Sequence, residues 1–237
     1  DSIGPLANSV ACCAAYDAVL AGEPQAALAE TPVKGLRFLL PRSSALQDLD
    51  REVGAAFEAA LGKLAAAGAV VTDMAVPAFD RQDRYFKDGG FAGAESYYIH
   101  RPSLDRIAEY DPRVAKRVLL GKAFAAADYV ELGFLRAAFI REVEALAAPF
   151  DAILMPTVPC VAPAIAEVDR SDEDFFRWNG RILRNNGLVN FLDGCGASLP
   201  IQPRGAAPVG LTVCGLAGSD RRTLPVAASI GRALARG

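Results

Sequence analysis

The feature of this sequence that most constrains its fold is a strand–helix–strand pattern between residues 33 and 72. Residues 33–40 are predicted to form an apolar strand that ends at Pro41, and residues 69–72 a second strand that follows Gly68. The segment between them carries apolar side chains at helical spacing, namely Val53, Phe57, Leu61 and Leu64. Two strands joined by one helix form a right-handed βαβ unit, so their sheet is at least partly parallel.

Further helical and strand-like segments extend this unit into a larger α/β fold. Helices are expected over residues 10–21, 113–121, 125–148 and 172–189 and from Asp220 or Thr223 to Ala235; strands are expected near residues 151–155, 197–201 and 209–214. No repeat and no low-complexity linker divides the chain. We therefore predict a single α/β domain with a mixed, largely parallel sheet flanked by helices, to which residues 1–237 contribute.

Charge, hydropathy and cysteine usage exclude several classes of protein. The 25 Lys and Arg residues and 28 Asp and Glu residues give a net charge of −3, which predicts no binding to nucleic acid or to an anionic membrane. The apolar runs are far shorter than the roughly 20 residues that span a bilayer. Five cysteines without a C-x-x-C pair, and His100 as the single histidine, predict a reduced, cytoplasmic protein with no metal site and no cofactor.

Residue chemistry alone supplies no complete catalytic group. The turn at residues 213–220 is rich in glycine, but its spacing is not that of a phosphate-binding loop, and a plain strand–helix turn is the favoured interpretation. Ser43 and Ser44 lack flanking glycines and a nearby base, which favours a helix cap or a turn. A nucleophilic Cys195 would need His100 as its base, and a small buried cysteine is favoured instead.

A cluster of basic residues follows the helix start at residues 110–112. Arg113 and Arg117 are four residues apart and therefore lie on one helix face, with Lys116 beside them. A solvated surface and a ligand contact are equally compatible with this pattern. Because the guanidinium group binds a carboxylate through two hydrogen bonds, these residues are candidates for contact with an acidic ligand.

Several short motifs follow one another along the chain. Residues 1–10 read D-S-I-G-P-L-A-N-S-V, residues 151–157 read D-A-I-L-M-P-T, and residues 183–186 read L-R-N-N. Residues 198–200 (S-L-P) and 208–211 (P-V-G-L) come after them. In this order they resemble the C-terminal half of the amidase-signature family of serine hydrolases, which includes amidotransferase A subunits and bacterial amidases.

The resemblance implies a hydrolase that cleaves carboxamides through a Ser–Ser–Lys triad, with backbone N–H groups that stabilise the oxyanion. In the family these groups lie upstream of the motif that opens this chain, and no glycine- and serine-rich run occurs in residues 1–237. Because residue 1 is Asp rather than Met, we expect a fragment of a longer chain. No catalytic residue is therefore expected here. The N-terminal half of the same enzyme is the expected partner, and this chain alone is expected to be inactive.

The same resemblance implies that this half contributes part of the sheet and one wall of the pocket for a small-molecule amide. The expected substrate contacts are Tyr97, Arg117, Thr157, Pro159 and Cys160. Arg117 falls where glutamine-using amidotransferase A subunits have an arginine that holds the substrate carboxylate.

Two positions distinguish the chain from those subunits. Leu183 takes the place of an acidic residue, and Asn186 that of a threonine three places later. The missing acid argues against glutamine as the substrate and favours a free-standing amidase. The alternatives are a non-catalytic subunit or binding module with an amidase-derived fold, and a nucleotide-binding α/β domain, for which the G-x-G-x-x-G turn is absent. The sequence leaves the oligomeric state open, a homo-oligomer included.

Overall fold

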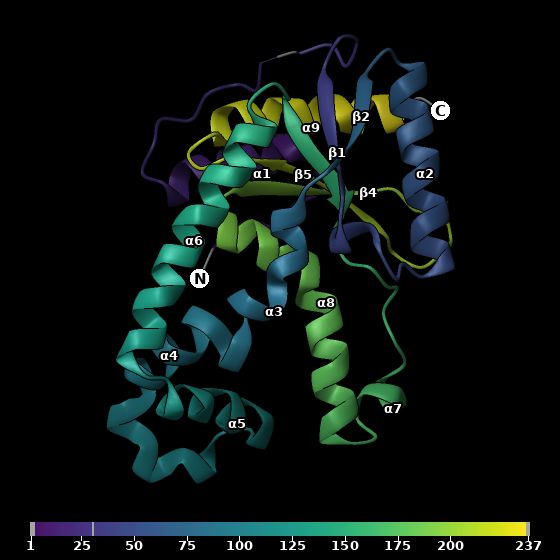
Figure 1. Cartoon of the computed structure of the whole chain (residues 1–237). Coiled ribbons are helices and arrows are strands. Elements are labelled where there is room, and N and C mark those ends of the chain that lie inside the picture. Colours follow the sequence, from purple (N-terminus) through teal and green to yellow (C-terminus); the bar gives the residue numbers. More distant parts are fainter. Residues whose placement is uncertain (1–2, 30, 236–237) are drawn as a thin grey trace.

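The computed structural model describes residues 3–29 and 31–235 and is built on a five-stranded sheet (Figure 1). The strands are β1 (Arg37–Arg42), β2 (Val70–Ala75), β3 (Ala152–Pro156), β4 (Cys195–Pro200) and β5 (Gly210–Gly215), in the order β2-β1-β3-β5-β4. β1 pairs in parallel with β2 and β3, whereas β5 is antiparallel to both β3 and β4. All strands except β5 therefore point in one direction, which confirms the predicted mixed, largely parallel α/β sheet.

The predicted βαβ unit is present, because α2 (Arg51–Ala66) connects β1 to the parallel β2. Gly68 follows α2 with a φ of +89°, a left-handed conformation that glycine adopts without steric cost. The prediction that Pro41 ends the first strand is wrong, because β1 continues through it. β3 pairs with β1 only at Phe38 and Leu39, so the missing N–H of Pro41 costs no hydrogen bond of that ladder.

Helices cover both faces of the sheet. α6 (Ala126–Ala147) and α8 (Asp172–Leu192) lie on one face, and α2 and α9 (Asp220–Ala235) lie on the other (Figure 1). The shorter helices are α1 (Val10–Leu20), α3 (Gln82–Tyr85), α4 (Gly90–His100), α5 (Pro112–Leu120) and α7 (Ile165–Val168), with 3-10 turns η1 (Ser44–Leu46), η2 (Pro77–Arg81), η3 (Lys87–Gly89), η4 (Arg101–Glu109) and η5 (Gly121–Ala123). α4 and α5 lie at the ends of α6 and α8 that are distant from the sheet (Figure 1).

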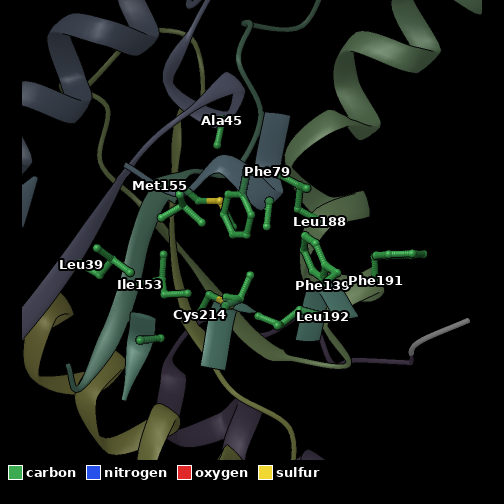
Figure 2. Close-up of a cluster of buried hydrophobic side chains, with 14 of the residues drawn as sticks. Leu39, Ala45, Phe79, Phe139, Ile153, Met155, Leu188, Phe191, Leu192 and Cys214 are labelled. Carbon is green, nitrogen blue, oxygen red and sulfur yellow. The ribbon is translucent and has the colours of Figure 1, made fainter. Parts of the chain in front are cut away.

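A buried apolar core fixes α6 and α8 against the sheet (Figure 2). Ile153 and Met155 of β3 face this core, whereas Leu154 faces α2 and α9, as the two-residue period of a strand requires. Phe139 of α6 and Phe191 of α8 meet edge to face, with ring centroids 5.2 Å apart. The position of α8 relative to β3 is therefore set by close packing, which also determines where the residues along α8 lie.

The N-terminal segment and α1 leave apolar side chains in solvent. No residue of α1 is buried, although the helix reads V-A-C-C-A-A-Y-D-A-V-L. Ile3, Leu6 and Leu20 expose 87%, 101% and 61% of their surface. An apolar surface of this kind is typical of a protein–protein or domain interface.

Two features are absent from residues 3–29 and 31–235. Within them, no helix is long and apolar enough to cross a membrane. Nor do three or more His, Cys, Asp or Glu side chains gather there in a way that would hold a metal ion.

Candidate functional site

The carboxyl ends of β1 and β3 are neighbours at one edge of the sheet, and their connections leave in opposite directions. From β1 the chain crosses to β2, and from β3 it crosses to the other side of the strand order, toward β4. In open α/β sheets such a point leaves a crevice in which ligands bind. The loops that follow the two strands, residues 43–50 and 157–161, are therefore the segments best placed to form a site.

Asn185 of α8 joins these two loops. Its side chain is buried, and its Nδ2 donates hydrogen bonds to the carbonyl oxygens of Ala45 (3.0 Å) and Pro156 (2.8 Å). Both amide hydrogens are thus used, one at the end of each strand. Its Oδ1 accepts a hydrogen bond from Nε of Arg184 at 3.3 Å. One buried amide group therefore bridges the two loops.

A second set of contacts holds the 157–161 loop to the start of α2. The backbone N–H of Asp50 donates to the carbonyl oxygen of Pro159, at 2.8 Å. The Asp50 carboxylate accepts from the backbone N–H of Val161 (3.0 Å) and from Arg181 (2.8 Å). Cys160 is buried in this network, and burial raises the pKa of its thiol. Pro159 and Cys160 therefore point into the protein and shape the loop from within.

Arg184 adds a cation to the same network. Its Nη2 donates to the carbonyl oxygen of Gln47, at 2.6 Å, so α8 also contacts the loop between β1 and α2. Burial lowers the pKa of its guanidinium group, an effect that the nearby Asp48 carboxylate opposes. Asp48 itself has a φ of +47°, a conformation that non-glycine residues rarely adopt and that packing must hold in place.

Thr157 carries the hydroxyl group of the predicted substrate loop. Its Oγ1 lies 2.7 Å from Oγ of Ser198 and 2.9 Å from Oγ1 of Thr212, so a hydroxyl just after β3 meets hydroxyls of β4 and β5. Gly210 packs against them, since a Cβ at this position would lie 2.6 Å from the hydroxyl oxygens of both Thr157 and Ser198. Sequence reasoning named Thr157 but missed Ser198 and Thr212. These two residues are found only from the pairing of β4 with β5, in which Ser198 lies opposite Thr212.

The basic residues of α5 face α8. Arg113 donates to Asp169 (2.6 Å) and to Asp172 (3.2 Å), and Lys116 forms an ion pair with the same Asp172. These carboxylates raise the pKa of the Arg113 guanidinium group, mainly through the hydrogen bond to Asp169. The part of the basic face nearest the start of α8 is therefore neutralised within the chain.

Arg117 and Tyr97 belong to one helical unit. Arg117 is exposed, and its Nη1 donates to Oδ1 of Asn179 at 3.0 Å. Tyr97 of α4 is half-buried and packs against Gly121, directly after α5, where a side chain would collide with it. This close approach of α4 and α5 requires glycine at position 121.

The predicted substrate contacts thus form two groups that α8 connects. Tyr97 and Arg117 lie on α4 and α5, whereas residues 157–160 lie at the sheet edge (Figure 1). Asn179 contacts Arg117 and Asn185 contacts Pro156, and these two positions on α8 are about 9 Å apart along the helix axis. Along α8 the two groups are therefore separated by less than two helical turns.

The structure does not bring Cys195 and His100 together. Sγ of Cys195 lies 3.4 Å from Oγ of Ser219 and 3.3 Å from Oγ1 of Thr223. Nδ1 of His100 lies 3.0 Å from the hydroxyl of Tyr110. A Cys–His nucleophile is therefore excluded for this pair, and Cys195 is half-buried rather than buried.

Two other sequence candidates have local structural roles, as predicted. The segment after β5 is a plain strand–helix turn, in which the hydroxyls of Ser219 and Thr223 lie over Gly215, 3.2 Å apart. The Ser43 side chain accepts a hydrogen bond from the backbone N–H of Ala45 and caps η1. Both segments thus have contacts that serve the local fold.

Comparison with known proteins identifies the family to which this geometry belongs. Residues 1–224 match the family described as Amidase. The chain belongs to the amidase family. The resemblance inferred from the order of the motifs is therefore confirmed, and the mixed sheet with its flanking helices is the fold of that family.

Relatives in the amidase family are longer than this chain. The chain is 29% identical to "2-amino-5-chloromuconic acid deaminase" of Comamonas testosteroni, with 100% of the chain and 52% of the relative aligned. It is 28% identical to "Indoleacetamide hydrolase" of Agrobacterium vitis, over 99% of the chain and 54% of the relative. A crystal structure of an amidase superposes with a TM-score of 0.78 at 26% identity, over 97% of the chain and 52% of that structure. The chain thus spans about half the length of the curated relatives it matches.

Proposed function

We propose that this chain is the C-terminal part of an amidase, a hydrolase that cleaves carboxamide C–N bonds. The main support is the match of residues 1–224 to the amidase family, whose members extend to about twice this length. An upstream segment supplies a Ser–Ser–Lys triad and the N–H groups that stabilise the oxyanion, and the acyl-enzyme forms on its serine. All five cysteines of this chain are free, in keeping with a reducing, cytoplasmic location.

The exposed surface of α1 supports an upstream partner segment. Apart from Asp17 the helix is apolar on all sides, and helices of that composition are buried in folded proteins. Tyr16, Val19 and Leu20 expose about 60% of their surface. We propose that the upstream half covers these side chains and completes the domain.

The role of the present chain is to form one wall of the substrate pocket. Thr157 contributes a hydroxyl at the sheet edge, Pro159 and Cys160 set the shape of its loop, and Tyr97 and Arg117 contribute from α4 and α5. Because a guanidinium group favours planar anions, Arg117 contacts the acidic end of a small amide. The name of one relative, which specifies an acid as its substrate, is in keeping with that class, whereas the name of the other specifies indoleacetamide, which carries no acid.

The test compares the whole protein, including any upstream segment, with residues 1–237 alone. Ammonia release from primary amides should be catalysed by the whole protein and not by the shorter chain. Replacing the upstream serine nucleophile by alanine should abolish it. Turnover by residues 1–237 that survives a Cys195→Ala control would overturn the proposed division of labour. A whole protein that binds amides without hydrolysing them would support the non-catalytic binding module instead.

A further inference from the structure

The basic residues of α5 differ in how their charge is balanced. Arg113 and Lys116 share the carboxylate of Asp172. Arg117 contacts the neutral amide of Asn179, and no carboxylate of residues 3–29 or 31–235 lies within ion-pair distance of its guanidinium group. An amide oxygen satisfies one N–H group but adds no negative charge. The charge of Arg117 therefore remains available to an anion.

The two partners on α8 allow a direct comparison. Asp172 and Asn179 are seven residues apart, which is close to two helical turns, and both point toward α5. Aspartate and asparagine have nearly the same shape and differ in charge. At position 172 α8 supplies a carboxylate that balances the charge of Arg113 and Lys116. At position 179 it supplies a neutral amide that binds Arg117 without balancing its charge.

Asn179 also restricts the direction of the Arg117 side chain. The hydrogen bond from Nη1 occupies one of five guanidinium N–H groups and spans from α5 to α8. The remaining donors suit a carboxylate, which accepts two parallel hydrogen bonds. Because Asn185 ties α8 to the end of β3, the guanidinium group is held about 9 Å along the helix axis from the sheet edge.

We propose that Asn179 is a specificity-determining residue that positions Arg117 without balancing its charge, so that the pocket prefers amides carrying a carboxylate. Since it assigns a substrate class to the same pocket, this role rests on the proposed function. Asn179 acts through Arg117 and does not itself take part in bond cleavage.

The test uses succinamate and succinamide, two primary amides of similar size whose far ends are a carboxylate and a neutral amide. Initial rates of ammonia release by the whole protein give kcat and KM for each, before the succinamate formed from succinamide accumulates. Asn179→Asp should lower the ratio of kcat/KM for succinamate over succinamide at least tenfold, mainly through KM for succinamate. Turnover of succinamide should stay within about twofold of the parent. Gln25→Glu adds the same charge at an exposed position and should leave the ratio unchanged.

A double-mutant cycle separates positioning from a purely structural role. In an Arg117→Ala background, Asn179→Asp should produce no further change in the ratio, because the residue acts through Arg117. Equal losses with both substrates, or an unchanged ratio with normal turnover, would overturn the role of Asn179 while leaving amidase activity established.

If the whole protein hydrolyses neither compound, calorimetric binding of the two compounds decides the role of Asn179. The proposed amidase function fails only if no other primary amide is hydrolysed either. In calorimetry the parent should bind succinamate more tightly than succinamide, and Asn179→Asp should remove that difference. Equal binding of the two compounds by the parent would overturn the proposed role of Asn179.

Discussion

Asn185 donates a hydrogen bond to the carbonyl oxygen of Pro156, 2.8 Å away, and so ties the middle of α8 to the end of β3. The same helix carries Asn179, the partner of Arg117. The core packing of α8 and this one buried amide therefore together set the distance from the sheet edge to the guanidinium group. If that amide is removed, both loops at the sheet edge lose one of their shared supports, and the contacts of Asp50 remain.

Replacing Asn185 by leucine should destabilise the fold strongly. Leucine is similar in size but donates no hydrogen bond, so the carbonyl groups of Ala45 and Pro156 lose a buried partner. Each unsatisfied group costs about 1–3 kcal/mol, and we expect the free energy of unfolding in urea to fall by about 2–6 kcal/mol. Glu173→Gln, at an exposed position on the same helix, should change it by less than about 0.5 kcal/mol. Equal effects of the two substitutions would contradict this role.

Elements with a local signal were predictable from the sequence. The βαβ unit follows from apolar periodicity and from Gly68, because neighbouring residues alone determine both. Pro41 misled the prediction, because its effect depends on how far β3 extends beside β1, and that is a property of the assembled sheet.

The contacts that organise the site could not be predicted in the same way. Asn185 binds carbonyl groups that are 140 and 29 residues distant in the sequence, and Arg117 and Asn179 are 62 residues apart. Resemblance to a family pointed to Arg117 but gave no partner for it. The neutral partner of Arg117 and the acidic partner of Arg113 become distinguishable only when α5 is placed beside α8.

Gly210 is a position where the fold requires glycine for lack of space. A Cβ there would lie 2.6 Å from the hydroxyl oxygens of Thr157 and Ser198 and 2.9 Å from Cβ of Thr157. Gly210→Ala should therefore lower the free energy of unfolding by about 1–3 kcal/mol. Gly62→Ala is the matched control, because Gly62 lies in α2 with open space around it, and alanine should stabilise the helix by up to about 1 kcal/mol. Denaturant titrations that shift both variants in one direction would contradict the steric account.

Asp174 should make stability depend on acidic pH. Its carboxylate accepts hydrogen bonds from Arg170, Arg177 and Ser171, which hold the pKa of this carboxyl group well below its usual range. A carboxyl group with a lowered pKa in the folded state stabilises the fold above its unfolded pKa of about 3.8, and this contribution is lost as pH falls through the folded pKa.

Asp174→Asn removes this ionisation, so the variant should be less stable than the parent at pH 7 and should lose less stability between pH 5 and pH 2. Unfolding free energies measured at several pH values test this. Parallel pH profiles for the parent and the variant would show that the carboxylate contributes nothing through its ionisation.

The free cysteines report on both the loop at the sheet edge and the surface of α1. Cys12 is exposed, whereas Cys160 and Cys214 are buried. Burial raises the pKa of the Cys160 thiol and raises that of Cys214 to about 12, which disfavours the reactive thiolate at both positions. In residues 1–237 alone, iodoacetamide should label Cys12 first, as followed by peptide mass spectrometry, and should reach the two buried cysteines only at the rate of unfolding. Cys160 labelling as fast as Cys12 would mean that the contacts of Asp50 do not hold the 157–161 loop.

In the whole protein, an upstream half that covers α1 should also protect Cys12. Labelling of Cys12 at the same rate in both forms would therefore contradict the proposed domain interface without affecting the prediction for Cys160.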